Sequence, residues 1–306
     1  MKVKVKSLAV FLGLLLLSAC RQGDNGQRKV VPLVGTVVSD RSEPYNRLLS
    51  SFDLRSSDGG LVLFGAESEV LALGEYLLHS DLFDNVDARR NPDLLPDFSG
   101  EKVVEVTLGN ASLLSDTLGG GLKLRTASIK AVLSSLDTLV RGKAVVLTSP
   151  AMCTYGKFDI DSLQRAFSLE NLVFCPLELM ADSSEGGRVA VLSPYPAGVY
   201  EEYFKYREDV DYVGVLTPSQ MADSLHTELD RLSADVILVD ACLQDTDSLR
   251  LSHPGLRFVD WREQTGKALY VALRERNVFT HRVAYPQKES VWAICSEDLT
   301  YSFNNR

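Results

Sequence analysis

The sequence predicts an α/β fold with mainly parallel β-sheets. Short runs of Val, Ile and Leu alternate with amphipathic helical patterns along the chain, as in residues 236–240 and 264–276. Several of these runs are apolar at every position, which is typical of strands buried on both faces of a sheet. Strands that alternate with helices need crossover connections and therefore pair in parallel.

The strand predictions rest on short apolar runs and the helix predictions on apolar residues repeated with helical spacing. Strands are expected at residues 33–38, 61–64, 103–108, 144–148, 172–175, 189–193, 212–216, 236–240, 257–260 and 291–295. Helices are expected at residues 67–78, 127–140, 160–167, 198–206, 220–233 and 264–276.

A polar, glycine-containing stretch at residues 183–187 is the strongest internal boundary, because a new strand follows it at once. It divides the chain into two Rossmann-like lobes, residues 30–185 and 186–276, with a cleft between them. The remaining residues, 277–306, form a C-terminal segment that can return to the first lobe. With 306 residues, 45% of them hydrophobic, the chain is long enough for two cores.

The first twenty residues have the parts of a secretory signal in the usual order. Three lysines precede an apolar run that is too short to span a bilayer, which needs about 20 residues. The sequence Leu17-Ser18-Ala19-Cys20 then resembles the lipobox of bacterial lipoproteins. The resemblance implies a signal peptide at residues 1–19, a lipid on Cys20, and a tether at residues 20–29 that anchors the protein to the inner or outer membrane of the cell envelope. A secretory peptide cleaved elsewhere is the alternative.

Composition narrows the function classes. The net charge is −9 and no basic cluster occurs, so nucleic acid is not an expected partner. Glycine-rich phosphate loops, GxSxG and HExxH are absent from the sequence, and the four histidines are scattered. We therefore expect no cofactor and no metal. The expected partners are the membrane, through the lipid on Cys20, and a small-molecule ligand.

Polar residues follow several of the predicted strands. Loops after parallel strands lie at the carboxyl edge of the sheet, where open α/β folds bind ligands. The candidate ligand-binding residues are Ser39, Glu67, Ser149, Thr154, Ser193, Thr217 and Asp260.

Cys153 and Cys242 each follow a strand, one in each lobe. Two thiols that face each other across a cleft can perform two-base chemistry, in which one thiolate removes an α-proton and the opposite thiol returns one. Neither cysteine has a base or cation nearby in sequence to lower a thiol pKa of about 8.5. Buried structural cysteines are therefore the alternative, and the pairing of Cys153, Cys175, Cys242 and Cys295 stays open.

Residues 188–274 resemble the aspartate/glutamate racemase superfamily. The likeness lies in a strand, a Ser-Pro loop, a helix, a second strand, and then an apolar strand that ends in Ala241-Cys242. It implies the superfamily's fold, with Cys153 and Cys242 as catalytic residues. The family motifs are Gly-Cys-Thr-His and Cys-Asn-Thr, whereas this chain has Ala241-Cys242-Leu243-Gln244 and Cys153-Thr154-Tyr155. Only the cysteines match, so the resemblance indicates fold more than activity.

A second resemblance concerns residues 34–49, where a predicted strand precedes a polar stretch that begins at Ser39. This pattern is similar to the opening of two-lobed periplasmic solute-binding proteins and implies a ligand in the interdomain cleft. Because such proteins are often lipid-anchored, we expect an envelope lipoprotein that binds a small polar solute without catalysis. The alternatives are a racemase-like envelope enzyme that uses Cys153 and Cys242, and a structural or assembly lipoprotein.

Overall fold

A computed structural model divides the chain into two compact units, residues 1–30 and 31–306. The structure describes residues 29–109, 121–137, 140–217, 227–228, 231–240, 246–280, 287–295 and 300–305. Across these ranges, no helix combines the length and apolar character that a membrane crossing needs. Cys20 and the predicted signal peptide lie outside them.

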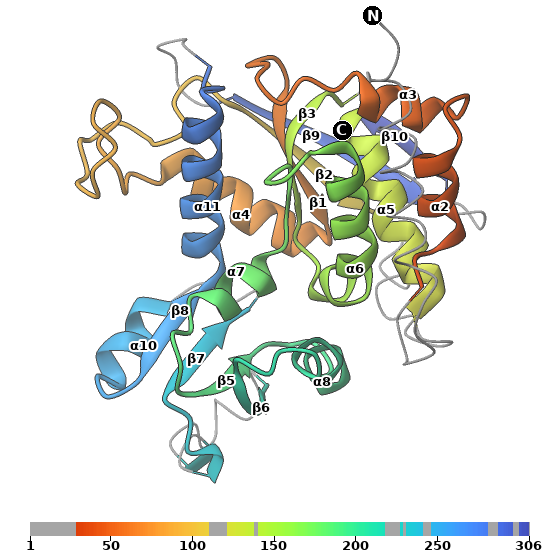
Figure 1. The fold of residues 1–306 in the computed structure, drawn as a ribbon. Coiled ribbons are helices and arrows are strands. Elements are labelled where there is room, and N and C mark those ends of the chain that lie inside the picture. Colours follow the sequence, from red (N-terminus) through yellow and green to blue (C-terminus); the bar gives the residue numbers. More distant parts are fainter. Residues whose placement is uncertain are drawn as a thin grey trace, which may run out of the picture. The chain divides into compact units, whose positions relative to one another are not determined.

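A six-stranded sheet forms the first half of the fold (Figure 1). Its strand order is β10-β9-β2-β1-β3-β4, and every neighbouring pair is parallel except β9 with β10. The interior strand Gly60–Gly65 is buried at every position, as expected for a strand covered on both faces of the sheet. The strands are β1 (Gly60–Gly65), β2 (Lys102–Leu108), β3 (Gly142–Leu147), β4 (Val173–Phe174), β9 (Gln287–Cys295) and β10 (Tyr301–Asn305).

A four-stranded parallel sheet follows, in the order β6-β5-β7-β8. Its strands are β5 (Arg188–Leu192), β6 (Asp211–Leu216), β7 (Val236–Val239) and β8 (Arg257–Asp260). The last two strands of the chain do not join this sheet, since β9 pairs with β2 over its length. Two mainly parallel sheets with intervening helices confirm the predicted α/β fold class.

Helices connect the strands, and several of them begin at a proline whose fixed φ suits the first helical turn. They are α2 (Pro32–Ser39), α3 (Pro44–Ser50), α4 (Glu67–His79), α5 (Leu122–Leu136), α6 (Pro150–Phe167), α7 (Pro176–Asp182), α8 (Ala197–Phe204), α10 (Thr246–Ser252) and α11 (Trp261–Arg276).

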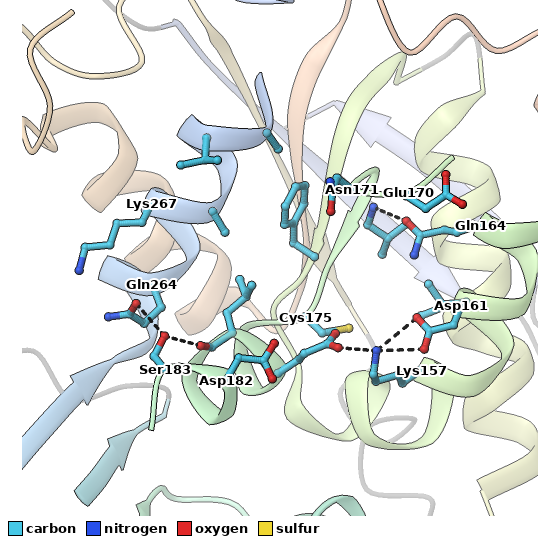
Figure 2. A pocket seen from close by; sticks show the side chains of 18 of the residues that line it. Lys157, Asp161, Gln164, Glu170, Asn171, Cys175, Asp182, Ser183, Gln264 and Lys267 are labelled. Atoms are coloured by element: carbon cyan, nitrogen blue, oxygen red, sulfur yellow. Dashed lines mark hydrogen bonds and ion pairs between the residues drawn. The ribbon is translucent and has the colours of Figure 1, made fainter. Parts of the chain in front are cut away.

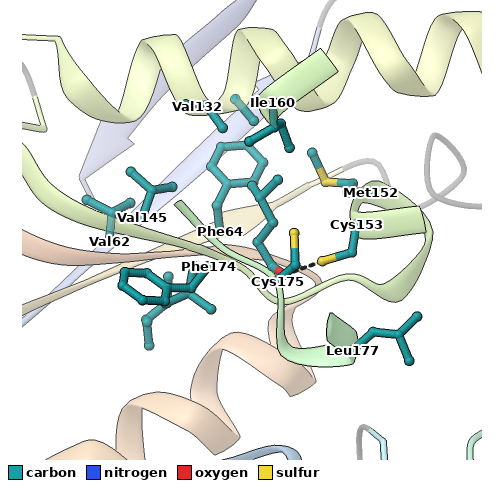
Figure 3. Close-up of a cluster of buried hydrophobic side chains, with 14 of the residues drawn as sticks. Val62, Phe64, Val132, Val145, Met152, Cys153, Ile160, Phe174, Cys175 and Leu177 are labelled. Atoms are coloured by element: carbon teal, nitrogen blue, oxygen red, sulfur yellow. Dashed lines mark hydrogen bonds between the residues drawn. The ribbon is translucent and has the colours of Figure 1, made fainter. Parts of the chain in front are cut away.

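Side chains from β1, β3, α5 and α6 form the core beside the first sheet. Figure 3 shows Phe64 of β1 and Val145 of β3 among Val132, Met152 and Ile160. The helices α5 and α6 pack against each other over this core. The ends of β1 and β3 are thereby fixed relative to α6.

The strand predicted at residues 33–38 is wrong, because these residues form the helix α2. Short apolar runs fit a buried helix as well as a strand. Val34 and Val37 are three positions apart and both buried, which puts them on one helical face. Asn46 donates a hydrogen bond of 2.7 Å to the carbonyl of Val37 and so joins α2 to α3.

Each sheet has a switch point, the place where successive strands of the chain stop being added on one side and start being added on the other. In the first sheet β1 lies between β2 and β3, and in the second sheet β5 lies between β6 and β7. Connections leave such a strand pair toward opposite faces, so a crevice forms at the carboxyl ends of the two strands. In this fold the switch points lie at the carboxyl ends of β1 and β3 and of β5 and β7.

Candidate functional site

Glu69 lies at the switch point of the first sheet. The helix α4 starts directly after β1, and its buried face includes Glu69, Val70, Leu73 and Leu77. Glu69 is 0% exposed, and Thr148 at the end of β3 donates a hydrogen bond of 3.1 Å to its Oε2. Its Oε1 has no hydrogen-bond partner among the described residues. A buried, half-satisfied carboxyl group is unusual and is a candidate for function.

Gly65 lets these groups approach one another. A Cβ at this position would lie 2.0 Å from Oγ1 of Thr148, 3.2 Å from Oε2 of Glu69 and 3.3 Å from the backbone nitrogen of Ser149. Only glycine therefore fits at the end of β1.

Ser193, Tyr200 and Asp240 form a second polar group, at the switch point of the second sheet. All three are nearly fully buried. The hydroxyl of Tyr200 is hydrogen-bonded to Ser193 at 2.5 Å and to a carboxylate oxygen of Asp240. Because a phenol has one proton and a carboxylate only accepts, Tyr200 donates to Asp240 and Ser193 donates to Tyr200.

The two switch points interact electrostatically. Burial and the charge of Asp240 raise the pKa of Glu69 to about 8, although the hydrogen bond from Thr148 lowers it. Burial and Asp240 also raise the pKa of Tyr200 well above its ordinary value. A pKa of about 8 lies close to neutral pH, the range that suits a general acid or base.

Unpaired hydroxyl groups surround the start of α6. Ser149 is the N-cap residue of α6 but makes no side-chain cap hydrogen bond, and it is 0% exposed. Its Oγ and the Oγ1 of buried Thr154 have no partner among the described residues. The positive end of the helix dipole favours negative charge at this position.

Cys153 belongs to the second turn of α6 rather than to a loop, since this helix starts ten residues before the predicted one. Figure 3 shows its sulfur beside that of Cys175. The thiol is buried and donates a hydrogen bond of 3.1 Å to the carbonyl of Leu147. Burial and the neighbouring Cys175 raise the pKa of Cys153, which favours its protonated form. Cys242 lies outside the described residues, so the two-thiol pairing stays a prediction.

Three of the predicted ligand-binding residues are buried, and three others lie at or next to the ends of helices or strands. Ser149, Thr154 and Ser193 lie in the buried polar region described above. Ser39 ends α2 and donates its hydroxyl hydrogen to the carbonyl of Gly35, and Glu67 is exposed at the start of α4. Thr217 follows the edge strand β6.

Asp260, also a predicted ligand-binding residue, caps α11. Its carboxylate accepts hydrogen bonds from Thr246 at 2.6 Å and from the guanidinium of Arg262 at 2.7 Å. Burial raises the pKa of Asp260, but the hydrogen bonds from Arg262 and Thr246 outweigh burial and leave it lowered. These contacts give Asp260 a clear structural role, and its role in ligand binding stays a prediction.

A groove of about 700 Å³ lies elsewhere, between α6, α7 and α11 (Figure 2). Lys157 in this groove is held by Glu178 at 2.6 Å and Asp161 at 3.0 Å. Neither Glu69 nor Asp240 lines it. Within the described ranges, no group of three or more His, Cys, Asp or Glu side chains is arranged to hold a metal.

Comparison of the sequence with protein-family models and with curated proteins finds no match. Among solved structures, glutamate racemase from Francisella tularensis in complex with D-glutamate aligns with a TM-score of 0.50 and 11% identity, covering 78% of this chain and 89% of that one. The glutamate racemase isoform RacE1 from Bacillus anthracis aligns with a TM-score of 0.50 and 10% identity, covering 79% and 90%. At this identity, the likeness shows a shared racemase-type fold.

These structures correct the expected function. The solute-binding interpretation is wrong, because the similar structures are racemases and because the supposed first strand at residues 33–38 is a helix. The expectation that the protein is not an enzyme is likewise not supported. The resemblance of residues 188–274 to the aspartate/glutamate racemase superfamily had implied this racemase-type fold.

Glu69, Tyr200 and Asp240 were not among the candidate residues. Glu69 lies four positions before Leu73, on the apolar face of α4. An acidic residue is unusual on such a face. Asp240 directly follows the strand Val236–Val239, so its position at a carboxyl edge could have been inferred. Tyr200 gives no comparable signal, because a tyrosine in an amphipathic helix is usually part of the core.

Proposed function

We propose that this protein is a cofactor-independent, racemase-like enzyme. It would remove and return a proton at a carbon atom next to the carboxylate of a small acid. The observation that carries this proposal is a buried, titratable polar group at each switch point, Glu69 with Thr148 and Asp240 with Tyr200, in which Oε1 of Glu69 has no hydrogen-bond partner among the described residues. The charge of Asp240 raises the pKa of Glu69 toward neutral pH. Titratable groups whose environments shift their pKa toward neutral pH are typical of proton-transfer sites.

The reaction needs a base that removes the proton from the carbon next to the carboxylate. It also needs groups that stabilise the negative charge that then develops on the substrate. Glu69, with a pKa of about 8, can hold the abstracted proton. The unpaired hydroxyls of Ser149 and Thr154 and the start of α6 can bind the substrate carboxylate as it gains negative charge. Proton transfer of this kind needs no electron sink beyond the substrate's own carboxylate.

Amino acids are the first substrates to test. The similar structures are named as glutamate racemases, and one of them holds D-glutamate. Glu69 and Asp240 are at most 1% exposed, so a substrate enters only when the two carboxyl edges separate. Two-base transfer between Cys153 and Cys242 is a second form of the same proposal. Its difficulty is the raised pKa of the Cys153 thiol.

We propose further that the enzyme is anchored in the cell envelope through lipid on Cys20, on the strength of the lipobox-like sequence. Labelled palmitate should enter the wild-type protein in cells and should not enter Cys20→Ala. Equal labelling of the two proteins would contradict the anchor.

Deuterium exchange tests the reaction. The mature protein is incubated in D₂O with the L and D forms of glutamate, aspartate and alanine, and loss of the α-proton signal is followed by NMR. We expect exchange and inversion with at least one amino acid. The surface variant Glu185→Gln, which alters an exposed ion pair with Arg257, should behave like the wild type. Absence of exchange with the whole panel would overturn the assignment.

A further inference from the structure

Two candidate bases near the first switch point differ in their surroundings. Both groups are almost fully buried, but the Cys153 thiol directs its hydrogen at the carbonyl of Leu147, 3.1 Å away. Glu69 has one oxygen bound to Thr148 and a second oxygen, Oε1, with no partner among the described residues. A group that accepts a substrate proton needs an oxygen that is not already taken by a hydrogen-bond donor, and Oε1 of Glu69 meets this condition among the described residues.

The position of Glu69 supports the same choice. Glu69 follows β1, the strand at the reversal of strand order, and lies near the start of α6. Oε2 of Glu69 and the backbone nitrogen of Ser149 lie 3.2 Å and 3.3 Å from the position that a Cβ at Gly65 would take, so a carboxylate bound at Ser149 would lie beside Glu69.

We infer that Glu69 is the catalytic acid–base group on the first sheet's side of the site, in place of a cysteine thiolate. This inference rests on the proposed function and assigns its proton acceptor. Ionised Glu69 takes the α-proton through Oε1, so that the C–H bond breaks and an O–H bond forms. The electron pair of the C–H bond passes into the substrate carboxylate as an enediolate.

Return of the proton completes the reaction. If Glu69 trades the abstracted proton with solvent and returns a solvent proton to the same face of the carbon, the product is the exchanged substrate with its original configuration. If Tyr200, hydrogen-bonded to Asp240 on the second sheet's side, donates to the opposite face, the configuration inverts; Glu69 then releases the abstracted proton to solvent, and Tyr200 regains one from solvent. Exchange and inversion therefore report on the two sides separately.

The groups that shift the pKa of Glu69 come from both sheets. Asp240, after β7, raises the pKa of Glu69, and Tyr200, on α8, shares this environment. Thr148, after β3, opposes Asp240 through its hydrogen bond. A pH profile for exchange should therefore shift to lower pH when the charge of Asp240 is removed.

Two measurements test this assignment. In the first, exchange of the active amino acid is compared in the wild type, in Glu69→Gln and in Glu75→Gln, an exposed glutamate on the same helix. We expect Glu69→Gln to lose about 10²- to 10⁴-fold in exchange rate and Glu75→Gln to match the wild type. Circular dichroism shows whether each variant is folded, and glutamine closely matches the shape of a protonated glutamate.

The second measurement needs no activity. The ¹³C signal of the Glu69 carboxyl carbon, identified by its absence in Glu69→Gln, is titrated in the wild type. A midpoint near pH 8 that falls in Asp240→Asn supports the assignment, and a midpoint between about 4 and 5 overturns it.

The outcomes separate the two proposals. Exchange retained in folded Glu69→Gln but abolished in Cys153→Ser would give the role to the thiol and overturn the inference alone. No exchange by the wild type with any amino acid would overturn the proposed function, and with it the catalytic role of Glu69, even if its titration midpoint lies near pH 8.

Discussion

Thr148 donates a hydrogen bond of 3.1 Å to Glu69 and so joins the carboxyl end of β3 to the helix that follows β1. Both residues are nearly fully buried. The bond fixes one carboxylate oxygen and leaves the other, Oε1, without a hydrogen-bond partner among the described residues. It is also the contact that limits how far burial and Asp240 raise the pKa of Glu69.

Replacement of Thr148 with Val should raise the pKa of Glu69 above about 8. The hydrogen bond favours the charged carboxylate, so its loss favours the neutral acid. Valine keeps the shape of threonine without the hydroxyl group. The carboxyl ¹³C titration checks this, and an unchanged or lower midpoint would show that the bond does not control Glu69.

Glu69 should make the wild-type protein less stable as the pH rises. The pKa of Glu69 is about 8 in the folded chain against an ordinary value of 4.5, so between these values the folded state holds a proton that the unfolded state has released. Its stabilising contribution is complete below pH 4.5 and is lost as the pH rises toward 8, by up to about 1.4 kcal/mol per pH unit.

Urea unfolding of the wild type and Glu69→Gln at several pH values within this window measures the effect. As the pH increases, the free energy of unfolding of the wild type should fall steadily relative to that of Glu69→Gln. Parallel pH dependence in the two proteins would mean that Glu69 titrates in its ordinary range.

Gly65→Ala should damage the site locally. The added Cβ would lie 2.0 Å from Oγ1 of Thr148, so the ends of β1 and β3 must move apart. We expect a loss of about 1–3 kcal/mol in the free energy of unfolding and a lower exchange rate. Gly198→Ala, where nothing lies within 4 Å of the new Cβ, is the matched control. Equal effects of the two changes would show that the close approach at Gly65 is unimportant.

Asp159 should be important for stability rather than for catalysis. It accepts hydrogen bonds from the guanidinium of Arg125 at 2.7 and 3.1 Å and from the backbone of Val31 at 2.8 Å, and its side chain is fully buried. Asp159→Ala leaves a buried cation without this partner and should cost about 3–5 kcal/mol. Glu185→Gln, at an exposed ion pair, should change the unfolding free energy by less than about 0.5 kcal/mol. Thermal unfolding of both variants gives the comparison.

Sequence patterns were sufficient for the fold class because fully apolar runs such as Val236–Val239 and long amphipathic stretches such as Trp261–Arg276 have one dominant interpretation. The run at residues 33–38 fits helix and strand equally, and tertiary packing decided it. The start of α6 was missed although Ser149 and Pro150 carry the usual signal of a helix beginning.

The candidate site was only partly predictable. The carboxyl edges of parallel strands predicted Ser149 and Ser193 as site residues, and the structure shows both buried near the switch points, while their role in ligand binding stays a prediction. The titratable groups of the site did not follow, because the pKa of Glu69 depends on burial and on Asp240, which is 171 positions away in the sequence. Sequence alone does not show that two such distant residues share one environment.

The most direct test of the account is α-proton exchange in D₂O by the wild type and by a variant that carries both Glu69→Gln and Asp240→Asn. These changes alter the acidic residue of each switch point. We predict that the wild type exchanges and inverts at least one amino acid in the panel and that the folded double variant does neither. Exchange by the double variant at the wild-type rate would contradict the claim that proton transfer takes place where the carboxyl edges of the two sheets meet.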